Sequence, residues 1–177
     1  MRYLSRWILK WLGWSPEGNL PPIDKYIIII VPHTSMLDFV LGRLFLFSLG
    51  LKVNVLIKKE LFFFPAGMLL KKLGGIPVNR SRRSQTIARM VEHFRKEDKF
   101  ILAIAPEGTR QKVEAWRTGF YYMATDAHVP IIPAFCDYKR KVFGMGPAFE
   151  PTGDMENDFL KLQSFFRHVT PFHPDRF

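Results

Sequence analysis

A histidine and an aspartate lie five residues apart where an apolar strand is expected to give way to a helix. His33 is a candidate general base because histidine titrates near neutral pH, and Asp38 could orient the ring and stabilise its charged form. Residues five apart do not share a helical face, so the pair meets only if His33 precedes the helix and Asp38 lies in its first turn. The alternative is a loop histidine beside a carboxylate that serves the helix dipole.

A second polar stretch combines glycine with arginine. Gly74 and Gly75 permit close backbone approach, a short apolar strand follows, and Arg80, Arg82 and Arg83 come next. The planar fork of arginine donates paired hydrogen bonds to phosphate, so this stretch is a candidate anion site. The other interpretation is a solvated basic loop.

A third polar stretch, with the sequence PEGTR, begins at Pro106 directly after another apolar run. Glu107 could hold a hydroxyl or orient an arginine, and Arg110 offers a further cation. Gly108 between them gives the backbone freedom to turn. The competing interpretation is an ordinary surface turn.

The hydropathy pattern predicts alternating strands and helices that would position these stretches. Strands are expected at 27–31, 53–57, 100–105 and 129–136, and helices at 36–49, 61–73, 84–96, 116–127 and 155–168. This order predicts a single-domain α/β fold with a mixed, mainly parallel sheet flanked by helices. His33 and Glu107 would both lie at the carboxyl ends of strands, where sites form in such sheets.

Several local features are expected to end, protect or line these elements. Gly50 should end the helix at 36–49, and Ser84 should cap the helix at 84–96. Residues 137–143 are expected to form an antiparallel edge strand, with basic side chains protecting the edge. The apolar helix at 61–73 could hold an acyl chain, although ordinary core is the alternative.

The first fourteen residues predict an amphipathic helix. Its apolar face would carry Leu4, Trp7, Ile8, Trp11 and Leu12, and its basic face Arg2, Arg6 and Lys10. Such a helix fits the membrane interface, while the alternative is a terminal helix docked on its own core. Residues 15–22 are expected to be a turn-rich connector. The expected division is therefore 1–22, a membrane-interface helix and connector, and 23–177, the main domain.

Composition narrows the classes of partner. The 177 residues carry a formal net charge of +10 and are 47% hydrophobic, which excludes a disordered chain and favours anionic partners such as a membrane surface. Aromatic residues are not interleaved with basic ones, so no nucleic acid is expected as a partner. No apolar run reaches the roughly 20 residues of a spanning helix. One cysteine, Cys136, excludes an intramolecular disulfide, and no metal site is expected.

Four blocks in one order resemble the glycerolipid acyltransferase family, whose bacterial type is 1-acylglycerol-3-phosphate acyltransferase. The resemblance covers roughly residues 27–134 and is close to a compact bacterial branch. The blocks are H-x4-D at His33 and Asp38, a glycine-led strand with Gly75, Ile76, Val78 and Arg80, PEGTR at 106–110, and VPIIP at 129–133.

The resemblance implies transfer of a fatty acyl group from acyl-CoA or acyl carrier protein to a hydroxyl of a lysophospholipid, in phospholipid synthesis. His33 and Asp38 would be catalytic, and Arg80 would bind the acceptor's phosphate. The acceptor would be positioned by Glu107, Gly108, Thr109 and Arg110. No bound cofactor is implied, and the protein would lie peripherally on the cytoplasmic side of the cell membrane.

One departure and several alternatives accompany the resemblance. Family members often carry asparagine before the histidine, where this chain has Pro32. The default acceptor, 1-acylglycerol-3-phosphate, is inherited from the family, and a non-phosphate lipid such as a lyso-ornithine lipid is the alternative. A non-catalytic lipid-binding protein and a thioesterase are further alternatives.

Overall fold

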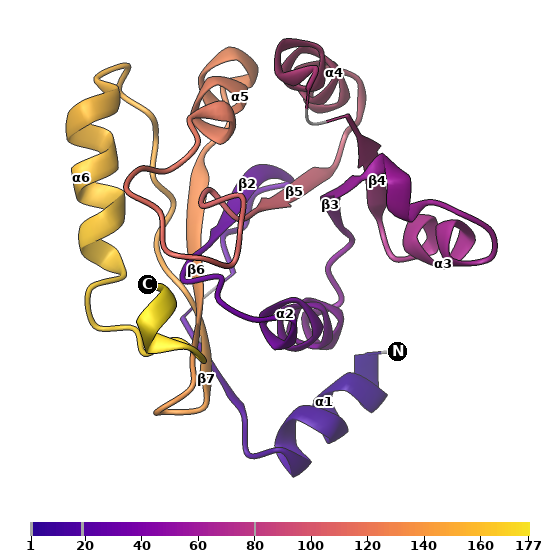
Figure 1. Ribbon diagram of the computed structural model, residues 1–177, viewed down its shortest axis with the longest axis vertical. Helices are drawn as coiled ribbons and strands as arrows, with labels where there is room; N and C mark the ends of the chain where they lie inside the picture. The colour runs from indigo at the N-terminus through magenta and orange to yellow at the C-terminus, as the bar shows by residue number, and fades with distance from the viewer. Residues whose placement is uncertain (1, 19, 80) are drawn as a thin grey trace.

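A seven-stranded sheet forms the centre of the molecule, which is described by a computed structural model over residues 2–18, 20–79 and 81–177. Its strand order is β1-β7-β6-β2-β5-β3-β4, and each pair is parallel except β6 and β7 (Figure 1). The predicted α/β class with a mixed, mainly parallel sheet is confirmed. The strands are β1 (Ser15–Glu17), β2 (Lys25–Ile30), β3 (Val53–Lys58), β4 (Gly75–Val78), β5 (Phe100–Ile104), β6 (Ile131–Asp137) and β7 (Val142–Met145).

Helices cover both faces of the sheet. On one face lie α4, α5 and α6, and on the other lies α2, with α1 packed against it (Figure 1). The short helix α3 lies beyond the sheet edge formed by β4. The helices are α1 (Arg2–Trp11), α2 (Met36–Leu49), α3 (Ala66–Lys72), α4 (Arg83–Lys96), α5 (Gly119–Ala127) and α6 (Met155–Phe165).

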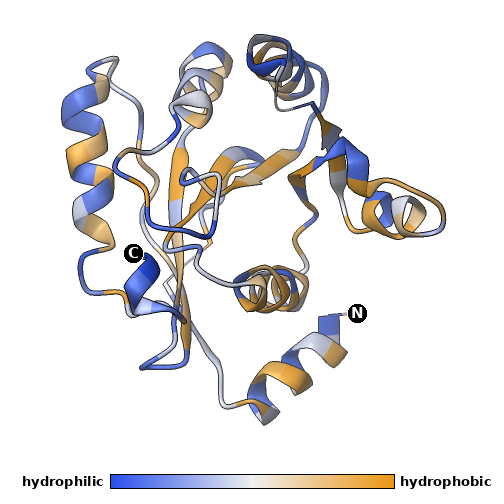
Figure 2. Cartoon of the chain, viewed as in Figure 1, coloured by the Kyte–Doolittle hydropathy of each residue, from blue (hydrophilic) through white to orange (hydrophobic). Residues whose placement is uncertain are grey.

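The isoleucine run of β2 is buried on both faces, which is why it is continuous rather than alternating. Ile27 and Ile29 pack in the core beneath α4, α5 and α6, while Ile28 packs in the core beneath α2. β2 lies between β5 and β6, so all its neighbours are strands from later in the chain. Figure 2 shows the apolar residues concentrated along these central strands.

Helix α1 has the predicted amphipathic pattern, but it meets the protein through the buried Ser5 and Leu9 and through the side that carries Arg2 and Arg6. Arg6 donates from Nε to the Ser48 carbonyl at 3.0 Å, and the Arg2 side chain lies against Gly50, so both cations sit at the carboxyl end of α2. The apolar face points outward, with Trp7 65% and Trp11 76% exposed. Among the described residues, no helix is both long and apolar enough to cross a membrane.

The structure corrects the expected edge strand at 137–143 and the expected connector at 15–22. β6 continues to Asp137, the chain turns, and β7 returns antiparallel to it. β1 then pairs parallel with β7 on its other side, so β7 is not an edge. The short SPE strand has no β-propensity of its own. It is held by the backbone ladder and by the Arg140–Glu17 ion pair at 2.6 Å.

The helix expected at 61–73 is also corrected. A 3-10 turn (Lys59–Leu61) comes first, and α3 is confined to Ala66–Lys72. Pro65 explains the late start, because the residue before a proline is disfavoured in helical conformation. The segment is not core: Phe63 is 63% and Phe64 84% exposed, and the loop appears as an orange stretch beside α3 in Figure 2.

Three helix ends differ from expectation. Helix α4 begins at Arg83 rather than being capped by Ser84, because a turn at Asn79 starts it early: Asn79 Oδ1 accepts from the Ser81 N–H at 3.1 Å. Helix α5 begins at Gly119 rather than at 116, and α6 ends at Phe165 rather than at 168. The prediction that Gly50 ends α2 is confirmed by its left-handed φ of 78°.

Candidate active site

The turn from β2 into α2 is built around the carboxylate of Asp38. Ser35 is the N-cap of α2 and its hydroxyl accepts from the Leu37 N–H at 3.1 Å. Asp38 Oδ2 accepts from the backbone N–H groups of Thr34 and Ser35, each at 2.8 Å, which completes a capping box. The alternative role of Asp38, a carboxylate at the helix start, is therefore present together with its contact to histidine.

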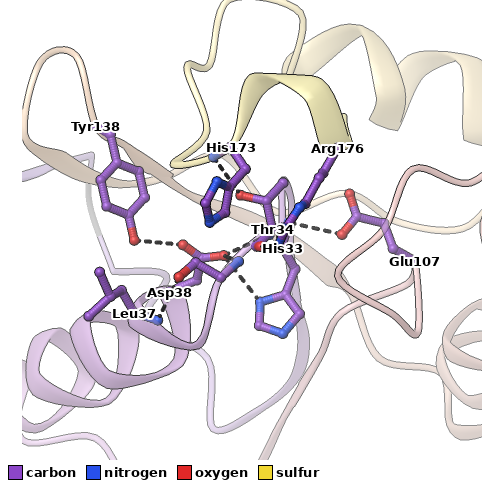
Figure 3. Close-up of polar contacts among 9 residues, drawn as sticks. His33, Thr34, Leu37, Asp38, Glu107, Tyr138, His173 and Arg176 are labelled. Carbon is purple, nitrogen blue, oxygen red and sulfur yellow. Dashed lines mark hydrogen bonds and ion pairs between the residues drawn. The ribbon is translucent and has the colours of Figure 1, made fainter.

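His33 lies before α2 and Asp38 in its first turn, as the pairing requires. Nδ1 of His33 is 3.5 Å from Asp38 Oδ2, and the carboxylate is buried while the ring is 22% exposed (Figure 3). Burial alone would raise the pKa of Asp38, but hydrogen bonds from His33, Tyr138 and Ser35 hold it below its ordinary value. The carboxylate is thus ionised at neutral pH and faces a partly accessible imidazole.

Tyr138 is a member of this site that the sequence did not reveal. Its hydroxyl donates to Asp38 Oδ1 at 2.6 Å, and burial together with that carboxylate raises the pKa of the phenol well above its ordinary value. The ring is held edge-on by Trp14 and by Phe172, each with centroids 5.1 Å away. Tyr138 follows β6, 100 residues after Asp38. Only the pairing of β6 with β2 brings the two together.

Glu107 lies at the carboxyl end of β5, next to β2, and accepts from the backbone N–H of His33 at 2.8 Å. It does not ion-pair with an arginine within the described ranges. The side chain is 5% exposed, and burial raises its pKa to about 7, opposed by the His33 hydrogen bond. Gly108 follows with a φ of +65°, and a Cβ there would lie 2.3 Å from Arg117 Nε. The PEGTR stretch is therefore a structured turn that supports the histidine loop.

Thr109 and Arg110 line a pocket of about 320 Å³ on the Thr34 side of the histidine loop. Its other lining residues are Thr34, Ser35, Met36, Gln111, His173 and Arg176. The last two come from the carboxyl-terminal segment, which no motif marked. Of the other predicted site residues, Arg80 lies outside the residues that the structure describes.

The arrangement suits proton transfer by an imidazole. The Asp38 contact at Nδ1 fixes the ring so that Nε2 points away from the carboxylate and is free to accept a proton. Cys136 is 1% exposed, and burial raises the pKa of its thiol, so it remains a neutral core residue. An acceptor hydroxyl activated by His33 needs no nucleophile from the protein.

Comparison with solved structures defines the class of fold. A crystal structure of the 1-acyl-sn-glycerophosphate acyltransferase PlsC from Thermotoga maritima matches with a TM-score of 0.65 and 17% identity. The match covers 96% of this chain and 80% of that one. The α/β sheet with its histidine loop at the carboxyl end of β2 therefore has the PlsC-type fold.

The family follows from the sequence comparison: the Acyltransferase family model matches residues 16–137, and the chain belongs to that family. The 1-acyl-sn-glycerol-3-phosphate acyltransferase of Escherichia coli (strain K12) is 36% identical over 83 residues, 43% of this chain and 34% of that protein. The Haemophilus influenzae protein of the same name is 29% identical over 145 residues, 75% of this chain and 59% of that one. The chain spans less than two thirds of the length of these relatives.

Proposed function

We propose that this protein is an O-acyltransferase that moves a fatty acyl group from acyl-CoA or acyl carrier protein to a hydroxyl of a lysophospholipid. The acceptor that we propose is 1-acylglycerol-3-phosphate, which would place the reaction in phospholipid synthesis. The observation that carries the proposal is the His33–Asp38 contact at 3.5 Å, with the carboxylate buried and the ring accessible. The names of the relatives support the substrate class.

In the proposed reaction, Nε2 of His33 takes the proton from the acceptor hydroxyl as its oxygen attacks the thioester carbonyl. The imidazolium is stabilised by Asp38 across the Nδ1 contact. The tetrahedral intermediate then collapses, the carbon–sulfur bond breaks, and the leaving thiolate takes the proton back from His33. The products are the acylated lipid and the free thiol of the donor, so no acyl group is carried by the protein.

The remaining site residues position the reactants in this proposal. Glu107 fixes the backbone at His33 through the 2.8 Å hydrogen bond and so helps to fix the position of the imidazole ring. Gly108 allows that turn, and Thr109 and Arg110 hold the acceptor from the pocket they line. Arg80 is assigned to the acceptor's phosphate on the strength of the sequence motif alone.

We further propose that the protein acts peripherally on the cytoplasmic side of the cell membrane, with residues 1–22 as the interface segment and 23–177 as the acyltransferase domain. The support is the outward apolar face of α1, where tryptophans suit the headgroup region. The net charge of +10 adds attraction to anionic lipid. A lipid acceptor and an acyl chain would both reach the site from such a surface.

The test is a thiol-release assay with purified protein and acyl-CoA or acyl carrier protein, run against lysophospholipids and unphosphorylated lyso-lipids. We expect thiol release that requires lysophosphatidate as acceptor. Release should fall by at least about a thousandfold in His33→Ala, because that variant has no general base. Circular dichroism should show both proteins folded.

Other outcomes would redirect the assignment. Release that needs a lyso-ornithine lipid would move the acceptor to the non-phosphate class. Release without any acceptor would indicate a thioesterase. No release with either donor, together with intact lipid binding, would favour a non-catalytic lipid-binding protein.

A further inference from the structure

The carboxyl-terminal segment, residues 172–176, lies across the histidine loop although it is outside the residues matched by the family model. The backbone N–H of His173 donates to Thr34 Oγ1 at 3.2 Å, and Phe172 packs edge-on against Tyr138 with centroids 5.1 Å apart. The first contact spans 139 positions and ties the segment to the loop that carries His33, and the second ties it to Tyr138. The segment therefore forms a wall of the candidate active site (Figure 3).

The pocket beneath this wall is lined by cations and hydrogen-bond donors. Arg110 enters from the turn after β5, and His173 and Arg176 enter from the carboxyl-terminal segment. Thr34 and Thr109 add polar side chains between them. Among the described residues that line the pocket, none is acidic. A volume of about 320 Å³ accommodates a phosphate group with part of its ester.

The side chains of His173 and Arg176 are not the main contacts that hold residues 172–176 against the histidine loop. The anchoring contacts are a backbone N–H and the Phe172 ring, as described above. The two contacts recorded for the Arg176 guanidinium are long, 3.5 Å to the Thr34 carbonyl and 3.9 Å to Asp175. Asp175 is 76% exposed, so that ion pair is strongly screened by solvent. The guanidinium fork can therefore exchange these contacts for a ligand.

We propose that Arg176 and His173, together with Arg110, bind a phosphate group of a substrate in this pocket. Guanidinium groups pair bidentately with phosphate oxygens, and the ring N–H of a histidine donates a further hydrogen bond. The identity of the substrate rests on the proposed function. The phosphate belongs either to the lysophospholipid acceptor or to the CoA part of the donor. The pocket is lined by Thr34, the residue after His33, and its position suits a phosphate group of either substrate.

The kinetic test compares Arg176→Gln with Arg167→Gln, a matched loss of charge at an exposed arginine just after α6. The acceptor is a short-chain lysophosphatidate kept below its micelle concentration. We expect Arg176→Gln to raise one KM roughly tenfold or more while Arg167→Gln leaves both unchanged. A rise in the acceptor KM assigns the phosphate to the acceptor, and a rise in the acyl-CoA KM assigns it to the donor. Equal KM values for the two variants would overturn the proposal.

Calorimetric binding without turnover separates this proposal from the acyltransferase assignment. The probes are glycerol 3-phosphate and CoA, titrated into the wild-type protein, Arg176→Gln and Arg176→Lys. Binding that is lost in Arg176→Gln and largely kept in Arg176→Lys supports the phosphate pocket even if no acyl transfer is found. Binding that ignores Arg176, or no binding of either probe to the wild-type protein, overturns it even if the enzyme transfers acyl groups.

Discussion

Tyr138→Phe removes one hydroxyl and leaves the ring that packs between Trp14 and Phe172. The hydroxyl is the partner recorded for Asp38 Oδ1, at 2.6 Å, and Asp38 is 2% exposed. Removing it leaves one oxygen of a buried carboxylate without that donor. A hydrogen bond to a charged group is worth about 1.5–3 kcal/mol, so the variant should lose stability of that order.

Urea unfolding at neutral pH measures this loss. With a slope of about 2 kcal/mol per molar, a loss of about 2 kcal/mol lowers the unfolding midpoint by about 1 M. The matched control is Tyr122→Phe, since Tyr122 is 45% exposed on α5 and its change should stay within about 0.5 kcal/mol. The hydroxyl of Tyr138 also lowers the pKa of Asp38, so the loss should shrink as the carboxylate is protonated in acid.

The same variant tests whether the buried carboxylate must be held in place for catalysis. We expect kcat in the thiol-release assay to fall by about tenfold with little change in KM, because a carboxylate that can rotate orients His33 less well. If Tyr138→Phe and Tyr122→Phe unfold at the same urea concentration and turn over at the same rate, the tyrosine does not position Asp38.

Three further changes test other parts of the structure. Glu107 has a folded-state pKa of about 7 against an ordinary 4.5, so the native state binds the extra proton and its stability falls as pH rises between these values. Glu107→Gln should therefore gain roughly 2–3 kcal/mol relative to wild type between pH 5 and pH 8, measured by urea unfolding at each pH. Trp7→Ala combined with Trp11→Ala should weaken sedimentation with anionic vesicles by more than about tenfold, because both rings are exposed. Ile28→Ala should lower the free energy of unfolding by about 2–5 kcal/mol, because it opens a cavity between β2 and α2.

Each of these has a control that the chain supplies. If the difference in stability between wild type and Glu107→Gln does not change with pH, the claim that Glu107 is buried and takes up a proton in the native state is contradicted. Leu160→Ala, at an exposed position on α6, should leave vesicle binding intact. If Leu160→Ala loses as much vesicle binding as the Trp7→Ala, Trp11→Ala double variant, α1 has no special role in that binding. Ile23→Ala, at a position 37% exposed, should cost less than about 1 kcal/mol.

The parts of the fold that the sequence predicted are those encoded locally. The isoleucines of β2 carry a strand signal by themselves, and the position of Asp38 in the first turn of α2 depends only on the local cap at Ser35. The PEGTR turn was predicted because its glycine and its position after a strand are both visible in sequence. Because parallel strands end at the same edge of a sheet, these local signals also predict that His33 and Glu107 lie at one edge, and the pairing of β2 with β5 places them there.

The parts that were missed depend on long-range contacts. Tyr138, His173 and Arg176 have no motif around them, and they reach the site only after β6 pairs with β2 and the last residues fold back. The outward face of α1 was also undecided from sequence, since a helical wheel shows two faces but not which one meets the protein. The Arg6 contact to the Ser48 carbonyl decides it, and that partner is 42 residues away.

The pairing of β1 with β7 bears on how the chain acquires its structure. Ser15 is in register with Val142, so the amino-terminal strand cannot take its place until nearly the whole of the sheet-forming sequence exists. β2 likewise needs β5 and β6 as neighbours. Sheets built from such distant pairings close large loops before they gain contacts, and they fold in milliseconds to seconds rather than microseconds. During that interval the isoleucines of β2 are uncovered, so the partly folded chain is prone to self-association.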